Sequence, residues 1–228
     1  MVKKLKLKRY FSSFVISLLI FFLGMLIAQW INLYQSSEMF FSLSQKSLDL
    51  DTVELLSNYI SLLLRENKTS NTTCKVIGKS IEVAILLLEQ TNSKLQYYEE
   101  EKVFPTTEYT ALKREYIHAL FRLYILTELY SDICGEKIVN ILYFYSTPCD
   151  SCPLQGEIIK KVQKSYEKNV FVYSFDADLE DVEPLISTLR YEYTVTSFPT
   201  TIVNGKKFEG LTGEEELKEY IDSIFKSK

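Results

Sequence analysis

Two cysteines separated by two residues, Cys149 and Cys152, are the residues of this chain with the clearest chemistry. A Cys-x-x-Cys motif either binds a metal ion or forms a dithiol–disulfide pair, and the surrounding residues decide which. Zinc needs two further ligands, and the remaining candidates, Cys74, Cys134 and His118, are not suitably spaced to supply them. The motif therefore predicts thiol–disulfide chemistry, with no metal ion and no cofactor.

The residues around the motif indicate how the two thiols are held. Residues 138–145 are almost all strand formers with little polarity, which is typical of a buried strand, and a helical stretch follows the motif to about Lys168. Backbone N–H groups and the dipole at a helix start stabilise a thiolate and lower its pKa. We therefore expect Cys149 to be the exposed nucleophile and Cys152, one turn into the helix, to be the resolving thiol. Pro153 fits the first helical turn, where a missing N–H costs little.

The remainder of the C-terminal part alternates between strands and helices. A second buried strand is expected at 170–175 and a helix at 179–193. Two short strands, 200–203 and 207–209, are joined by Asn204-Gly205, a strong hairpin signal, and a helix at 214–225 ends the chain. The predicted order is β-α-β-α-β-β-α, an α/β domain.

Four of these features occur together: the strand 138–145, the Cys149–Cys152 motif, the segment Val195-Thr196-Ser197-Phe198-Pro199-Thr200, and Asn204-Gly205 with Gly210 before the last helix. In this combination, residues 136–228 resemble the thioredoxin superfamily. The resemblance implies a thioredoxin-like fold in which the peptide bond before Pro199 is cis and Pro199 lies against the active cysteines. It also implies that the Phe198 backbone pairs with an extended segment of a protein substrate.

Three features depart from the family pattern. Pro148 replaces the familiar tryptophan before the first cysteine, and Tyr143 replaces a buried acid that handles protons in thioredoxin itself. The dipeptide Asp150-Ser151 lacks the histidine of the strongly oxidising members, and the charge of Asp150 opposes formation of a neighbouring thiolate. We therefore expect a pKa for Cys149 that is less depressed than in the strong oxidants, and a more reducing or intermediate potential.

The N-terminal part carries an apolar run. Residues 11–31 are almost continuously apolar, long enough as a helix for a bilayer core of roughly 30 Å, and residues 1–10 hold five cations and no acid. This pattern predicts a transmembrane helix over 11–31 with residues 1–10 in the cytoplasm and the bulk of the chain extracytoplasmic. The alternative is a cleaved signal peptide, for which the run is long and lacks a clear cleavage site.

Charge, glycosylation sequons and cysteine count bear on the partners and on the extracytoplasmic location. The net charge of −4 argues against a nucleic-acid partner. Two glycosylation sequons, at Asn67 and Asn71, give modest support to an outside location, and four cysteines in two pairs suit an oxidising compartment. We accordingly expect a single-pass membrane protein whose partners are the membrane, protein thiol or disulfide substrates and a redox partner that the sequence does not identify.

Residues 36–134 are predicted to form an α-helical bundle of three antiparallel helices, at about 47–65, 72–98 and 106–133. Cys74 begins the second helix and Cys134 ends the third, so these two ends meet in an antiparallel hairpin. A disulfide between them would close a loop of about 60 residues and stabilise a small bundle. The alternative is that these two cysteines relay electrons to the Cys-x-x-Cys motif. We read His118, in the third helix, as a packing or surface residue.

The function favoured by these patterns is that of an anchored, extracytoplasmic protein thiol–disulfide oxidoreductase that works through Cys149 and Cys152. The direction of net electron flow stays open. The alternative is a non-catalytic thioredoxin-like binding or scaffold module held at the membrane.

Overall fold

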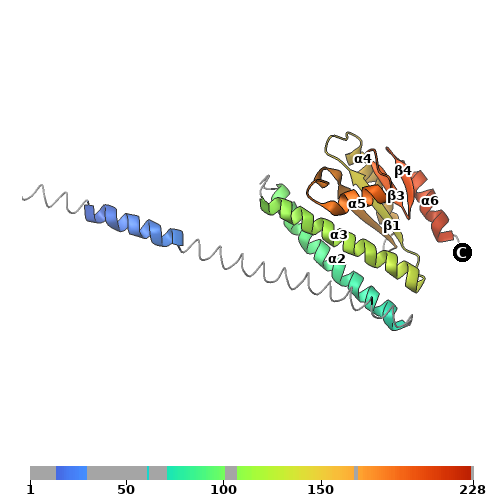
Figure 1. Ribbon diagram of the computed structural model, residues 1–228, viewed down its shortest axis with the longest axis horizontal. Helices are drawn as coiled ribbons and strands as arrows, with labels where there is room; N and C mark the ends of the chain where they lie inside the picture. Colours follow the sequence, from blue (N-terminus) through green and yellow to red (C-terminus); the bar gives the residue numbers. More distant parts are fainter. Residues whose placement is uncertain (1–13, 30–60, 62–70, 101–106, 167–168, 227–228) are drawn as a thin grey trace, which may run out of the picture. The chain divides into compact units, whose positions relative to one another are not determined.

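A computed structural model of the 228-residue chain describes residues 14–29, 61, 71–100, 107–166 and 169–226 (Figure 1). The chain divides into two compact units, residues 1–57 and 58–228. The Cys149–Cys152 motif and every strand described belong to the second unit.

The apolar N-terminal run forms a helix over residues 14–29, whose large apolar side chains are exposed. Within the described parts of the chain, no helix combines the length and apolar character needed to cross a membrane. The prediction of a transmembrane helix over 11–31 is therefore wrong. The predicted localisation as a single-pass membrane protein is wrong with it. The structure does not support the membrane as a partner and does not show an extracytoplasmic body.

The second unit contains a four-stranded mixed sheet in the order β2-β1-β3-β4. The central strand β1 (Val139–Tyr145) pairs in parallel with β2 (Val170–Asp176) and antiparallel with β3 (Thr200–Val203), which pairs with β4 (Lys206–Glu209). The parallel register runs from Val139 opposite Val170 to Tyr145 opposite Asp176. The loops that leave β1 and β2 and the loop that enters β3 therefore meet at one edge of the sheet.

Helices cover both faces of this sheet (Figure 1). The side chains of Leu142 and Phe144 point to one face and pack with residues of α3 and α5. Those of Ile141 and Tyr143 point to the other face and pack with α4 and α6. The helices involved are α3 (Thr107–Cys134), α4 (Cys152–Tyr166), α5 (Pro184–Glu192) and α6 (Glu214–Lys226). The alternation is the two-residue period of a strand that is buried on both sides.

Two long helices, α2 (Asn71–Glu100) and α3, form an antiparallel hairpin (Figure 1). Ile77 of α2 and Leu120 of α3 belong to the same buried cluster as Phe144 of the sheet. The hairpin and the α/β part thus share one core, within the compact unit 58–228. The predicted boundary between a bundle at 36–134 and a domain at 136–228 stays a prediction. The predicted first helix, 47–65, lies outside the described residues apart from Ser61.

After residue 136 the order of strands and helices agrees with the order expected from the sequence. One helix differs. The segment expected as a continuous helix over 179–193 is a 3₁₀ turn, η1 (Ala177–Leu179), followed by α5. Pro184 explains the break, because proline lacks an N–H and is tolerated at the first helical position but not inside a helix.

Glu183, which caps the start of α5, is bound by residues of the helical hairpin. Its side chain is 2% exposed, and its carboxylate lies 3.1 Å from Nε of Arg114 and 2.9 Å from Nε2 of His118. Burial opposes ionisation, yet hydrogen bonds from Arg114 and from the amide of Leu185 hold the pKa of Glu183 below its usual value. The predicted packing or surface histidine, His118, therefore lies beside a buried carboxylate.

We expect Glu183 to make the stability of the fold depend on pH. A carboxyl group with a lowered folded-state pKa stabilises the fold above its unfolded pKa of about 4.3, and this contribution is lost as the pH falls through the folded pKa. Glu183→Gln should therefore lower the unfolding free energy at pH 7 by about 2 kcal/mol and flatten its decline below pH 5. Denaturant unfolding between pH 7 and pH 3 measures both effects.

The matched control is Glu82→Gln, because Glu82 forms an exposed ion pair with Lys79 on the surface of α2. Exposed pairs contribute little, so the expected change in unfolding free energy is below about 1 kcal/mol. Equal effects of the two variants would contradict the assignment to Glu183.

Candidate functional site

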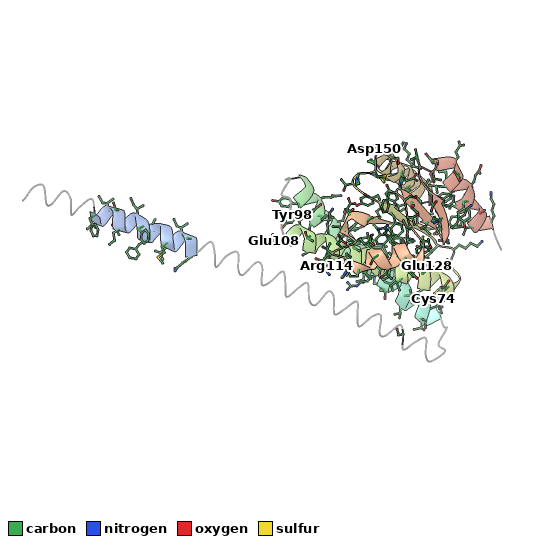
Figure 2. The ribbon with its side chains drawn as sticks, turned by 45° about the horizontal axis from the view of Figure 1, so that its top comes forward. Cys74, Tyr98, Glu108, Arg114, Glu128 and Asp150 are labelled. Atoms are coloured by element: carbon green, nitrogen blue, oxygen red, sulfur yellow. A yellow bond between two sulfur atoms is a disulfide. The ribbon has the colours of Figure 1, made fainter. Side chains whose placement is uncertain are left out.

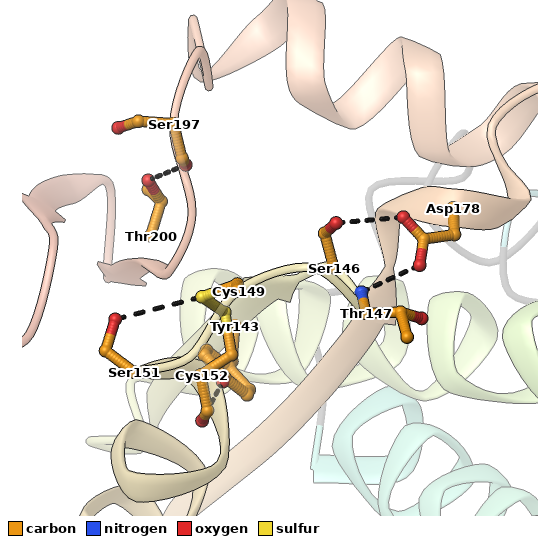
Figure 3. Close-up of a disulfide and its surroundings, with 9 residues drawn as sticks. All are labelled: Tyr143, Ser146, Thr147, Cys149, Ser151, Cys152, Asp178, Ser197 and Thr200. Carbon is orange, nitrogen blue, oxygen red and sulfur yellow. Dashed lines mark hydrogen bonds between the residues drawn. A yellow bond between two sulfur atoms is a disulfide. The ribbon is translucent and has the colours of Figure 1, made fainter.

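Cys149 and Cys152 lie at the junction of β1 and α4, where they form a disulfide (Figure 3). Cys149 is half-buried in the turn, whereas Cys152, the first residue of α4, is only 4% exposed. The amide of Cys149 donates to the carbonyl of Ser146 at 3.3 Å. The more accessible sulfur is therefore held at a helix start, where N–H groups favour a thiolate.

Tyr143 lies behind the disulfide, on the face of the sheet covered by α4. Its hydroxyl donates to the carbonyl of Cys152 at 2.5 Å (Figure 3). Burial raises the pKa of the Tyr143 hydroxyl to about 12, so this group stays protonated at neutral pH. At the position where the family pattern has a buried acid, this chain thus has a donor to the backbone rather than a base for the Cys152 thiol.

The loop that enters β3 reaches the same edge of the sheet as the turn that carries Cys149 (Figure 3). The Phe198–Pro199 peptide bond in this loop is cis. Pro199 is buried and Phe198 is half-buried. Thr200 Oγ1 donates to the carbonyl of Ser197 at 2.7 Å. The substrate-binding role expected for Phe198 and Pro199 stays a prediction.

Sequence reasoning missed Asp178, which follows β2. Its carboxylate accepts a hydrogen bond from Ser146 Oγ at 2.9 Å and from the amide of Thr147 at 2.7 Å (Figure 3). Hydrogen bonds from Thr147 and Ser146, opposed by some burial, hold the pKa of Asp178 below its usual value, and Lys113 adds to this. A signal was present, because an acid just after a strand parallel to β1 must lie near the end of β1.

A second disulfide joins Cys74 and Cys134, at the start of α2 and the end of α3. Cys134 precedes β1, whereas Cys149 follows it, and a strand of seven residues spans about 23 Å. Figure 2 accordingly shows Cys74 and Asp150 at opposite ends of this unit. Direct exchange between the two disulfides would need a large displacement, which supports a structural role for the Cys74–Cys134 pair.

Among the side chains that the structure describes, no three His, Cys, Asp or Glu residues are grouped so that they could hold a metal ion. The candidate site consists of the Cys149–Cys152 disulfide, the turn that carries it, Tyr143 and the loop with the cis peptide bond.

Comparison with known proteins gives relatives for part of the chain. No protein-family model matches it. Thioredoxin 2 of Plasmodium berghei is 27% identical over 77 residues, 34% of this chain and 45% of that protein. Thioredoxin 2 of Plasmodium falciparum is 29% identical over 68 residues, 30% of this chain and 40% of that protein. The chain thus spans less than half the length of the curated relatives it matches.

Solved structures also match only part of this chain, although the match covers most of their own length. Thioredoxin-2 of the malaria parasite matches 38% of this chain and 82% of its own, with 25% identity and a TM-score of 0.33. Chloroplastic thioredoxin z matches 44% of this chain and 89% of its own, with 20% identity and a TM-score of 0.34. The two sequence relatives show that the chain contains a thioredoxin-like segment.

Proposed function

We propose that the thioredoxin-like segment of this chain is a protein thiol–disulfide oxidoreductase that works through Cys149 and Cys152. The observation that carries the proposal is the asymmetry of the pair, with Cys149 half-buried in the turn and Cys152 buried at the start of α4. A redox dithiol needs one thiol that a substrate can reach and one that is shielded until the substrate is bound. A purely structural disulfide has no need of this difference.

The reaction follows from that asymmetry. The Cys149 thiolate attacks one sulfur of a substrate disulfide, that S–S bond breaks, and the other substrate sulfur leaves as a thiolate and takes up a proton. Cys152 then loses its proton and attacks the Cys149 sulfur, which forms the Cys149–Cys152 bond and releases the second substrate thiol. Two electrons pass from the dithiol to the substrate, and no cofactor is needed. The same steps in reverse oxidise a dithiol substrate.

The surface near the turn supports protein substrates. Leu154, Val182 and Leu211 are large, exposed apolar residues: the first lies in the first turn of α4, the second between η1 and α5, and the third just after β4, at the edge of the sheet that carries Cys149. Exposed apolar side chains around a reactive group are suited to contact an unfolded or extended protein segment. In this proposal Phe198 and Pro199 bind the backbone of that segment, and a redox partner outside the chain restores the dithiol.

Reduction of insulin by the full chain, with dithiothreitol as electron source, tests the proposal. The expected result is turnover that depends on the concentration of the chain and exceeds the rate with dithiothreitol alone. The complementary assay is oxidation of a reduced, unfolded protein by the disulfide form. Absence of turnover in both directions would favour the non-catalytic binding module.

The thiolate of Cys149 is expected to be only moderately stabilised. The start of α4 lowers its pKa, but the exposed carboxylate of Asp150 next to it raises the pKa by like-charge repulsion. We therefore expect a pKa of Cys149 above about 5, against about 3.5 for a strong oxidant. Thiolate absorbance of the reduced protein as a function of pH measures it, with Cys149→Ser as the blank. A value below about 5 would contradict the expectation.

A further inference from the structure

The turn that carries Cys149 is fixed to the end of β2 by a side chain. Asp178 accepts hydrogen bonds from Ser146 Oγ and from the amide of Thr147, the two residues that leave β1 (Figure 3). Ser146 in turn accepts the amide of Cys149 through its own carbonyl. The carboxylate of Asp178 is therefore two hydrogen bonds away from the backbone of the nucleophilic cysteine.

The backbone of Asp178 is connected to the helical hairpin through a second carboxylate, that of Asp176. Lys113 of α3 lies 3.2 Å from Oδ2 of Asp176, with 22% and 12% of the two side chains exposed. The other oxygen of Asp176 accepts the amide of Asp178 at 3.1 Å. Burial lowers the pKa of Lys113, but the carboxylate of Asp176 and the hydroxyl of Tyr109 together outweigh it, so that the pKa is raised. Lys113 is therefore held as a cation between α3 and the end of β2.

We propose that Lys113, Asp176 and Asp178 form a network through which the α2–α3 hairpin positions the turn that carries Cys149. In this network Asp178 is a positioning residue, because it acts on Cys149 through Ser146 and Thr147. The proposal rests on the proposed function, since it concerns the reactivity of the same thiol, and it gives the hairpin a part in the redox site.

The network matters most in the reduced protein. In the oxidised protein the Cys149–Cys152 bond holds Cys149 at the start of α4. Reduction breaks that bond, and the turn then depends on the Ser146 carbonyl and on the Asp178 contacts. A looser turn leaves Cys149 for less of the time beside the N–H groups of α4, which stabilise its thiolate.

The test is the pKa of Cys149 in the reduced protein, from the rate of iodoacetamide alkylation against pH. Lys113→Met and Asp178→Asn are each expected to raise this pKa by about half a unit, the size of a partial loss of helix-start stabilisation. The double variant should shift it no further than the larger single effect, because both changes interrupt one network. Ser146→Ala, which removes one contact to Asp178 and no charge, should shift it in the same direction.

If the two side chains acted on Cys149 only through their charge, the two variants would shift its pKa in opposite directions. Without a positioning role, loss of the Lys113 cation raises the Cys149 pKa, whereas loss of the Asp178 anion lowers it. Asp176 and Asp150 are unchanged in all these variants. A lowered pKa in Asp178→Asn, or no shift in Lys113→Met, would therefore overturn the proposal.

Arg114→Met is the matched control. Arg114 also joins α3 to the α/β part, through Glu183, but at the start of α5 rather than at the Cys149 turn. It is expected to leave the Cys149 pKa unchanged, and an equal shift in this variant would also overturn the proposal. Circular dichroism and mass spectrometry establish that each variant is folded with Cys74–Cys134 intact. Because alkylation needs no turnover, this test is independent of insulin reduction, whose failure would count against the proposed function alone.

Discussion

Replacing Cys149 with serine is expected to reduce the rate of insulin reduction to that of dithiothreitol alone. Only a sulfur at this position can attack a substrate disulfide, and the shielded thiol of Cys152, 4% exposed, does not reach one. This is the largest effect that the structure predicts for a single substitution. The measurement is the rate of insulin precipitation for equal concentrations of wild type and variant.

Cys152→Ser separates the two roles. This variant keeps the nucleophile and loses the resolving thiol, so the mixed disulfide between Cys149 and the substrate should accumulate. Non-reducing electrophoresis and mass spectrometry are expected to show a covalent complex with Cys152→Ser and none with Cys149→Ser. The reverse pattern, with the complex formed by Cys149→Ser, would contradict the assignment of nucleophile and resolving thiol.

The arrangement around the cysteines could be predicted from the sequence because its signals are local. An apolar run at 138–145, a Cys-x-x-Cys motif and a helical stretch predict strand, turn and helix, and this is the order found. The hairpin at Asn204-Gly205 could also be predicted, because this dipeptide favours the positive φ angles of a tight hairpin turn. Both residues have positive φ in the structure, 42° and 83°. Local backbone preference therefore fixes these elements without reference to the rest of the fold.

Two contacts near the site could not be predicted, because they join residues that are far apart in the sequence. The ion pair of Lys113 with Asp176 joins residues 63 positions apart, and the contact of Ser146 with Asp178 spans 32 positions. Each requires the register between β1 and β2 and the placement of α3 on the sheet. The packing of the hairpin against the sheet is a contact of the same kind, because the apolar stripes of α2 and α3 do not reveal that a sheet face shares their core.

Hydropathy was misleading at the N-terminus. A continuous apolar run predicts a membrane helix only if the helix it forms is both long and apolar enough to cross the bilayer, and no helix among the described residues meets both conditions. Composition alone supplies no helix bounds, so a run of suitable apolar length was read as a span.

Removal of the Cys74–Cys134 disulfide is expected to have the largest effect on stability. The bond joins residues separated by 60 positions, and a loop of that length corresponds to about 4 kcal/mol in the chain-entropy model. The double variant Cys74→Ala and Cys134→Ala should therefore lose between about 2 and 4 kcal/mol of unfolding free energy. Denaturant unfolding of the oxidised proteins measures the loss.

The Cys-x-x-Cys disulfide provides the internal comparison, because it closes a loop over only three positions. The same model gives about 2 kcal/mol or less for such a loop, so Cys149→Ser with Cys152→Ser should destabilise the fold less. A structural role for Cys74–Cys134 also requires that its removal leave the Cys149 pKa and the initial rate of insulin reduction unchanged at a temperature where the variant is folded. Loss of turnover without loss of stability would instead assign these cysteines to electron relay, and the long separation along β1 would then have to be bridged by movement of the hairpin.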